Sequence, residues 1–253
     1  MMTKQEQIFF EIHKDIPREG PGNYESTNTA YLLLKGLPAT PNILDVGCGP
    51  GKQTIDLSEI SSGKIIAVDN HEPYLERLRE KIIELNLDDR VSTKLGDMND
   101  LAVDEKSFDV IWAEGSIYLM GFGKALAHWK KFLKQNGYIV FSELCWFKNE
   151  RPEEIENYWN SFYGEMHSVD SIIKFLTNTD YKFIASYALP DEAWWEDYYL
   201  PLTNRITTLK EKYSKDPEAL SILENESVEI QMHKKYSNYY GYSFFVVQKI
   251  LSE

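Results

Sequence analysis

The sequence predicts a doubly wound α/β fold in a single domain. From Asn42 onward, short runs rich in β-branched residues alternate with longer helical stretches, which is typical of a parallel sheet covered by helices on both faces. A glycine-rich loop directly follows the first of these runs. The chain has 253 residues without an internal repeat or a Gly/Ser linker, so we expect one domain over 1–253.

The periodicity of the apolar residues predicts seven strands and four helices. The strands are expected at 43–46, 64–68, 91–94, 108–112, 137–142, 182–187 and 242–248. The helices are expected at 52–60, 72–85, 123–134 and 169–177. Three segments rich in aromatic residues do not fit this alternation: 1–40, 146–168 and 190–240. We expect 1–40 to be an N-terminal helical segment and 190–240 to be a helical, aromatic-rich insertion between the last two strands.

The balance of charge argues against partners that are themselves anionic. The chain has 27 basic and 40 acidic residues, a formal net charge of −13, which repels phosphate backbones and anionic lipid headgroups. No uncharged apolar run approaches the ~18 residues that a membrane-spanning helix needs. We therefore expect neither nucleic acid nor a membrane as a partner.

Cys48 and Cys145 are the only cysteines, and they lie far apart without a metal-ligand spacing. None of the five histidines is paired at such a spacing either, so no metal site is expected. Two isolated thiols without a disulfide framework suit a reducing compartment. We expect a cytoplasmic protein, and the sequence is compatible with a monomer or a homodimer.

The glycine loop has the spacing G-x-G-x-G over 47–51, between the first strand and a helix. Glycines at this turn permit positive φ and let the backbone approach a ligand. A dinucleotide fingerprint would place its third glycine at position 52, which is Lys52. A phosphate-binding P-loop would need Ser or Thr after Lys52, where Gln53 stands. The loop thus predicts a ligand site that is neither of these.

Acidic residues follow the next two predicted strands. Asp69 ends the second strand, and Asp97 follows the third beside Met98. An ionised carboxylate accepts hydrogen bonds only, so Asp69 suits two adjacent ribose hydroxyls, while Asp97 suits an adenine amino group and Met98 its ring. Aspartate is also favoured in turns, and either residue alone is equally well explained in that way. Together beside the glycine loop they favour a nucleoside site.

Five stretches carry a resemblance to a known family: LDVGCGPG, AVDN, GDM, FDVIWAEGSIY and YYGYSFFVVQK. In this order the chain resembles class I S-adenosylmethionine-dependent methyltransferases, in particular the small-molecule branch related to ubiquinone and menaquinone-biosynthesis methyltransferases. The resemblance implies a Rossmann-like, seven-stranded sheet with an antiparallel last strand, S-adenosylmethionine as cofactor and a small-molecule acceptor. The residues it implies for the cofactor are Asp45, Gly47, Cys48, Gly49, Gly51, Gln53, Asp69, Asn70, Gly96, Asp97, Met98 and Glu114.

The acceptor is expected on the loops that leave the carboxyl ends of the strands, where ligands bind in open α/β sheets. Glu114 and Tyr118 follow the fourth predicted strand, and Glu143 and Trp146 follow the fifth. Glu114, Tyr118 and Glu143 are therefore the catalytic candidates, although Tyr118 is at least as well explained as a packed aromatic. By the same topology, 190–240 starts on this side and is interpreted as a lid.

The aromatic residues of the expected lid have two interpretations. They could line an apolar acceptor pocket, or they could attach the lid to the core, which is favoured because burying large rings holds an added segment in place. The residues in question are Trp194, Trp195, Tyr198 and Tyr199.

Two other functions remain open at this point. A non-catalytic S-adenosylmethionine-binding or interaction protein would use the aromatic insertion as a partner surface, since a fold does not settle a function. A nicotinamide-dependent oxidoreductase is disfavoured by Lys52. Methylation of the amino group of adenine is not supported, because Ala113-Glu114-Gly115-Ser116 follows the fourth strand where an Asn/Asp-Pro-Pro-aromatic motif would be needed. Carbon methylation of cytosine is not supported either, because no Pro-Cys nucleophile follows that strand.

Overall fold

A computed structural model describes residues 3–250 and contains one seven-stranded sheet. The strand order is β3-β2-β1-β4-β5-β7-β6, in which β1 to β5 pair in parallel and β7 is antiparallel to both of its neighbours. The strands are β1 (Asn42–Val46), β2 (Lys64–Asp69), β3 (Val91–Leu95), β4 (Phe108–Ala113), β5 (Leu133–Trp146), β6 (Tyr181–Ala188) and β7 (Tyr240–Lys249). The predicted fold class, with its antiparallel last strand, is confirmed.

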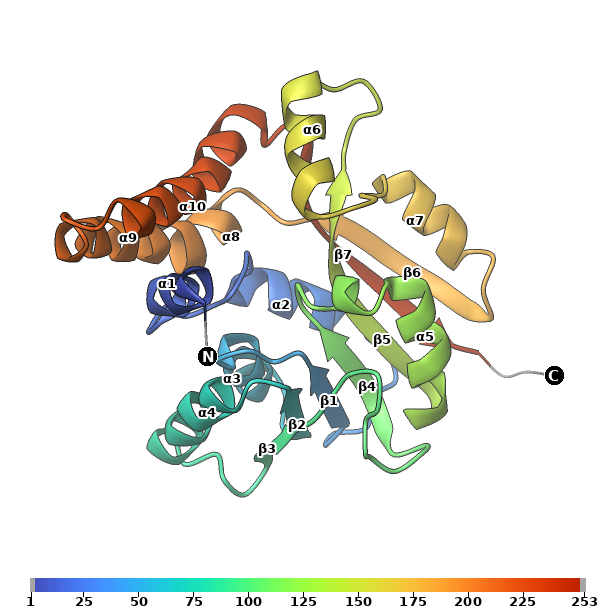
Figure 1. The fold of residues 1–253 in the computed structure, drawn as a ribbon. Helices are drawn as coiled ribbons and strands as arrows, with labels where there is room; N and C mark the ends of the chain where they lie inside the picture. Colours follow the sequence, from blue (N-terminus) through green and yellow to red (C-terminus); the bar gives the residue numbers. More distant parts are fainter. Residues whose placement is uncertain (1–2, 251–253) are drawn as a thin grey trace.

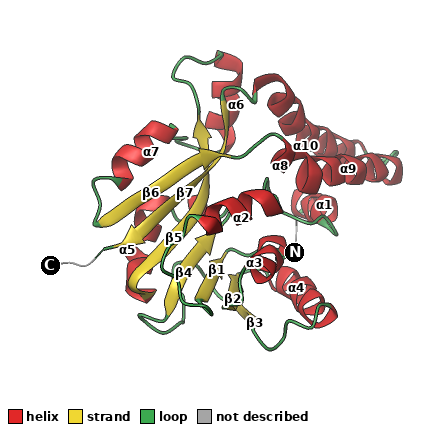
Figure 2. Cartoon of the chain, turned by 180° about the vertical axis from the view of Figure 1, so that it is seen from behind, coloured by secondary structure: helices red, strands yellow, loops and turns green. Residues whose placement is uncertain are grey.

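Helices cover both faces of this sheet (Figures 1 and 2). One face is covered by α2 (Tyr24–Leu32), α3 (Lys52–Ile60) and α4 (Glu72–Glu84). The other is covered by η1 (Ile117–Leu119), α5 (Phe122–Trp129) and α7 (Val169–Leu176). The remaining helical segments are α1 (Lys4–His13), η2 (Lys130–Phe132), α6 (Glu153–Phe162), α8 (Glu192–Trp194), the π-helix η3 (Trp195–Tyr199), α9 (Leu200–Lys212) and α10 (Pro217–Tyr236).

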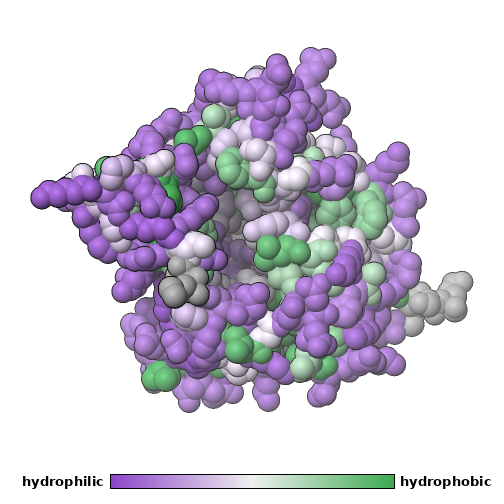
Figure 3. Space-filling model, in the orientation of Figure 1, coloured by the Kyte–Doolittle hydropathy of each residue, from purple (hydrophilic) through white to green (hydrophobic). Residues whose placement is uncertain are grey.

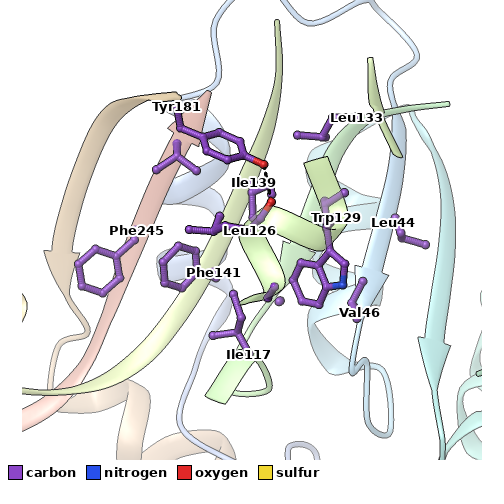
Figure 4. Packing of buried hydrophobic residues seen from close by; sticks show 14 of the residues in the cluster. Leu44, Val46, Ile117, Leu126, Trp129, Leu133, Ile139, Phe141, Tyr181 and Phe245 are labelled. Atoms are coloured by element: carbon purple, nitrogen blue, oxygen red, sulfur yellow. Dashed lines mark hydrogen bonds between the residues drawn. The ribbon is translucent and has the colours of Figure 1, made fainter. Parts of the chain in front are cut away.

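Large aromatic side chains fill the core under α5 and α7 (Figure 4). The rings of Phe141 on β5 and Phe245 on β7 stack at 5.2 Å, and Trp129 is completely buried beside them. Tyr181 donates a hydrogen bond from its hydroxyl to the carbonyl of Leu126 at 2.8 Å. These contacts fix β5 and β7 against the helices, so the carboxyl edge of the sheet has a rigid base.

Two element boundaries differ from the sequence-based expectation. The strand expected at 137–142 runs from Leu133 to Trp146, because its last residues pair with the start of β7 as far as Tyr240. Glu143 and Trp146 therefore lie within β5 and not on the loop after it. The helix expected at 123–134 ends at Trp129 and gives way to a 3₁₀ turn before β5 begins.

The segment 190–240 forms α8, η3, α9 and α10, and its last residue is the first of β7. The antiparallel helices α9 and α10 pack against α1, and Lys4 reaches Asp216 at the N-cap of α10 over 2.6 Å (Figure 1). Because Trp146 pairs with Tyr240, these helices connect to the sheet at the carboxyl end of β5. None of the helices in the described residues is long and apolar enough to cross a bilayer.

Candidate functional site

The glycine loop between β1 and α3 is held close to the neighbouring strands. Gly47 donates its backbone N–H to the carbonyl of Val68 at 2.8 Å and has a φ of 72°. A side chain at Gly47 would meet Cβ of Ser116 at 2.4 Å, and one at Gly51, where φ is 89°, would meet Leu78 at 2.3 Å. Glycine at these two positions therefore allows both the backbone conformation and the close packing of the β4 loop and α4.

Asp69 at the end of β2 holds the glycine loop in place. One carboxylate oxygen accepts the backbone N–H of Gly49 at 2.8 Å, and the other accepts that of His71 at 2.9 Å. Each oxygen of an ionised carboxylate can accept more than one hydrogen bond, so acceptor capacity remains on both. Asp69 thus combines a fixed position with free acceptor sites.

A pocket of about 430 Å³ opens beside this loop. The space-filling view shows the molecule hollowed near the centre of the face seen in Figure 1 (Figure 3). Many of the residues predicted for a cofactor line the pocket, from the ends of β1, β2, β3 and β4. They are Gly47, Cys48, Gly49, Gln53, Asp69, Asn70, Gly96, Met98 and Glu114.

Three of the predicted cofactor residues do not line this pocket: Asp45, Gly51 and Asp97. Asp45 is fully buried, accepts a hydrogen bond from Thr54 at 2.5 Å and has one oxygen without a partner among the described residues. Its burial raises the pKa of this carboxyl to about 7. Asp97 is exposed, and hydrogen bonds from Asn99 lower its pKa.

Glu114 is part of a buried charge network. Its carboxylate accepts hydrogen bonds from Thr27 at 2.8 Å, from the indole of Trp112 at 2.8 Å and from Arg18 at 2.9 Å. Arg18 also pairs with Asp56 of α3 at 2.6 Å. A carboxylate that accepts three hydrogen bonds, one of them from a cation, holds the pocket wall in place. Glu114 therefore lies at the pocket, and its catalytic role stays a prediction.

Sequence reasoning missed the contribution of the segment before α2. Arg18, Glu19 and Pro21 line the pocket, and Gly22 donates its N–H to the carbonyl of Ala193 in α8 at 2.8 Å. Burial raises the pKa of Glu19 to about 7, and one of its carboxylate oxygens has no partner in the described chain. The only local signal is the Gly-Pro-Gly turn at 20–22 directly after two charged residues.

Tyr118 and Glu143 lie on the other side of the pocket. Tyr118 lines it and is 43% exposed, and its ring lies 5.1 Å from that of Tyr163 at the end of α6. The hydroxyl of Tyr163 donates to Oε1 of Glu143 at 2.7 Å, while Oε2 of Glu143 has no partner among residues 3–250. Burial raises the pKa of Glu143 to about 7. Glu143 therefore lies behind the pocket wall, with Tyr163 connecting it to Tyr118 in the wall.

The aromatic residues of the insertion are mostly buried against the core. Trp194, Tyr198 and Tyr199 are at most 7% exposed, and Trp194 stacks on His233 with their rings 4.0 Å apart. None of these three lines the pocket, nor does Trp146, which is also buried. Their positions fit the interpretation that such rings attach the insertion. Tyr242 at the start of β7 does line the pocket, although no sequence pattern selects it.

The strand order and the pocket at the carboxyl ends of β1, β2 and β4 define a Rossmann-like protein with a ligand site at its topological switch point. The chain belongs to the methyltransferase domain family, whose sequence model matches residues 39–205. The match covers the glycine loop, Asp69 and Tyr118, but not Arg18, Glu19 or α10.

Individual relatives are more distant. The chain is 31% identical over 84 residues to 27-O-demethylrifamycin SV methyltransferase of Amycolatopsis mediterranei, covering 33% of this chain and 31% of that protein. It is 26% identical over 184 residues to sterol 24-C-methyltransferase of Kluyveromyces lactis, covering 68% and 49%. The chain thus spans less than half the length of these two relatives.

A solved structure resembles the whole fold. A SAM-dependent methyltransferase from Geobacter sulfurreducens, in complex with S-adenosylhomocysteine, superposes with a TM-score of 0.81 at 17% identity. The superposition covers 95% of this chain and 97% of that one. At this identity the likeness concerns the fold, and it covers more of the chain than the family match does.

Proposed function

We propose that this protein is an S-adenosylmethionine-dependent methyltransferase that acts on a small-molecule acceptor. The observation that carries the proposal is the convergence of the glycine loop, Asp69 and Met98 on one pocket. Family membership and the relatives that methylate small molecules support it. We also propose a cytoplasmic enzyme without a nucleic-acid partner, in keeping with the net charge of −13 and two free thiols.

The residues present fit the cofactor chemically. Asp69 offers free acceptor sites that suit a ribose diol, and Met98 offers an apolar contact beside Gly96 that suits an adenine ring. A side chain at Gly49 would meet only Glu19, at 3.6 Å, so the backbone of the loop is open towards the pocket. When bound, S-adenosylmethionine would supply an activated methyl group on a positively charged sulfur.

The chain's own contribution is to position the acceptor and exclude water, which is worth much in a displacement at carbon. Residues 190–240, through α8, hold the segment of Arg18 and Gly22 beside the pocket, and we propose that they act as a lid. We propose that Tyr118, which lines the pocket, contacts the acceptor. Because burial and the charge of Glu143 raise the pKa of Tyr118, its hydroxyl stays protonated and donates.

Calorimetry with S-adenosylhomocysteine, with NAD as the control ligand, tests the cofactor part of the proposal. Asp69→Ala should lower the affinity by about 1.5–3 kcal/mol, the range for a hydrogen bond to a charged group, which corresponds to roughly 10- to 150-fold. Asp170→Ala, which removes an exposed carboxylate outside the pocket, is the matched control. Equal affinities for all three proteins would remove Asp69 from the site.

Methyl transfer from labelled S-adenosylmethionine to a metabolite extract tests the catalytic part. Incorporated label supports an enzyme, whereas tight cofactor binding without any transfer supports a non-catalytic binding protein. Once an acceptor is found, Tyr118→Phe should lower kcat by about 10²-fold if the hydroxyl takes part in proton transfer, with the affinity for S-adenosylhomocysteine unchanged. Weakened cofactor binding in this variant would instead assign the β4 loop to the cofactor.

A further inference from the structure

Tyrosines and glutamates gather where the insertion, α6 and the sheet meet at the pocket. Tyr118 and Tyr242 line the pocket itself, Tyr163 packs against Tyr118, and Tyr198 stacks on Tyr199 of the insertion. We refer to this group as the tyrosine–glutamate cluster. It comprises Tyr118, Tyr163, Tyr198, Tyr242, Glu143 and Glu229.

Direct contacts tie each glutamate to a tyrosine. Glu143 accepts the hydroxyl of Tyr163, whose ring packs against Tyr118 in the pocket wall. On the insertion, Oε1 of Glu229 accepts the hydroxyl of Tyr199 at 2.9 Å. Both carboxyls are therefore held by neutral donors within a wall of aromatic rings.

No cation neutralises these two carboxyls within residues 3–250. The cations on neighbouring segments are committed elsewhere: Arg151 pairs with Glu156, and Lys235 pairs with Glu154, both at 2.5 Å. Glu143 is 6% exposed, and its second oxygen is left without any hydrogen-bond partner. A buried carboxyl that lacks a cation and a hydrogen-bond donor is stabilised when a positive or hydrogen-bond-donating group binds to it.

The members of the cluster also act on one another electrostatically. Burial, together with the charges of Glu143 and Glu229, raises the pKa of both Tyr118 and Tyr242. Burial raises the pKa of Glu143 and of Glu229 to about 7. The cluster therefore resists any further negative charge and would be stabilised by a positive one.

We propose that the methyl acceptor is a small organic amine, bound as a cation by the tyrosine–glutamate cluster; this inference rests on the proposed function. Aromatic faces and carboxylates are the two groups that attract ammonium ions. Here Tyr118 and Tyr242 line the pocket, and Glu143 lies behind them, joined to Tyr118 through Tyr163. Hydroxyl acceptors that react as phenolates are disfavoured, because the charges that raise the pKa of Tyr118 would equally raise that of a phenol.

Methyl transfer to the amine needs no further reactant. The bound ammonium releases its proton to solvent, which frees the nitrogen lone pair. The lone pair forms the N–C bond to the methyl carbon while the C–S bond breaks, and the electron pair of that bond stays on sulfur. The positive charge moves from sulfur to nitrogen, so the product is again a cation that the cluster stabilises.

Choline and its neutral isostere 3,3-dimethylbutan-1-ol have the same shape, but only choline carries a positive charge. Comparing their binding therefore isolates the contribution of charge. We expect protein saturated with S-adenosylhomocysteine to bind choline at least about 10-fold more tightly than the isostere in calorimetry. Equal binding of the two, or preference for the isostere, would overturn the proposal. Failure of S-adenosylhomocysteine itself to bind would instead contradict the proposed function.

Two variants of α10 with the same change in net charge sharpen this test. Glu229→Gln should lose most of the preference for choline while keeping its affinity for S-adenosylhomocysteine. Glu224→Gln removes an exposed carboxylate that pairs with Lys210, and it should keep the preference. If the cluster serves the sulfonium and not an acceptor, Glu229→Gln will weaken S-adenosylmethionine more than S-adenosylhomocysteine and leave choline unaffected, and the proposal is wrong.

Discussion

The two sides of the pocket are built in different ways. On the cofactor side, backbone N–H groups hold Asp69, and the glycine loop packs against Ser116 and Leu78 at distances that admit no side chain. On the acceptor side, Glu143 and Glu229 are held by tyrosine hydroxyls alone. The first side is rigid and holds Asp69 with backbone donors, whereas the second has capacity for a charged ligand.

The same difference explains what the sequence could predict. The cofactor side comes from short motifs at successive strand ends, so local patterns were enough to predict that Asp69, Gly49 and Met98 lie at one pocket. The acceptor side joins residues distant in sequence, such as Glu143 with Tyr163 and Tyr199 with Glu229. No periodicity reports such pairs, because they depend on how α6 and α10 are placed in space.

The length of β5 differs from the prediction for a related reason. The sequence predicts that 143–146 follow the fifth strand, yet these residues pair with 240–243 of the last strand. The pairing extends β5 beyond the end of β4 and carries Glu143 above it. Antiparallel pairing between segments nearly a hundred residues apart is a tertiary effect that overrides the local signal.

Arg18 is a buried arginine that joins the two sides of the pocket. Its replacement should have the largest effect on the free energy of unfolding. Arg18 contacts Asp56 on the cofactor side and lies 3.7 Å from Asp197 of the insertion. Arg18→Met should cost about 3–5 kcal/mol in the free energy of unfolding, because it leaves buried carboxylates without their cation. Urea denaturation measures this loss.

The control for Arg18→Met is Lys52→Met, since Lys52 also pairs with Asp56 but is one third exposed. Its loss should stay near or below about 1 kcal/mol, as for exposed ion pairs. Equal losses in the two variants would show that Arg18 does not join the two sides of the pocket.

A pair of glycine substitutions sharpens the description of the cofactor side as rigid. Gly51→Ala places a methyl group 2.3 Å from Leu78 at a φ of 89°, whereas Gly36→Ala at a φ of 72° meets nothing within 4 Å. Both variants bear the cost of positive φ, so the difference between them isolates packing. We expect Gly51→Ala to be less stable than Gly36→Ala by about 1–3 kcal/mol, the usual cost of overpacking.

Thermal unfolding at pH 7 measures both glycine variants. A difference close to zero would mean that α4 yields easily, and the cofactor side would then be no more rigid than the acceptor side.

The acceptor side is tested by the pH dependence of stability. Burial raises the pKa of Glu143 to about 7 in the folded protein, above the value of about 4.5 expected in the unfolded chain. Between these two values the folded state binds more protons than the unfolded state, so the contribution of Glu143 to the free energy of unfolding falls as the pH rises from about 4.5 to about 7.

Glu143→Gln replaces the protonated carboxyl by a neutral amide that can still accept the hydroxyl of Tyr163. The variant should therefore match the wild type near pH 5 and exceed it by on the order of 1–2 kcal/mol at pH 8, measured by urea denaturation at both values. If its advantage is the same at both pH values, Glu143 is already ionised at pH 5 in the folded protein, and the contrast between a cofactor side held by backbone donors and an uncompensated acceptor side fails at this residue.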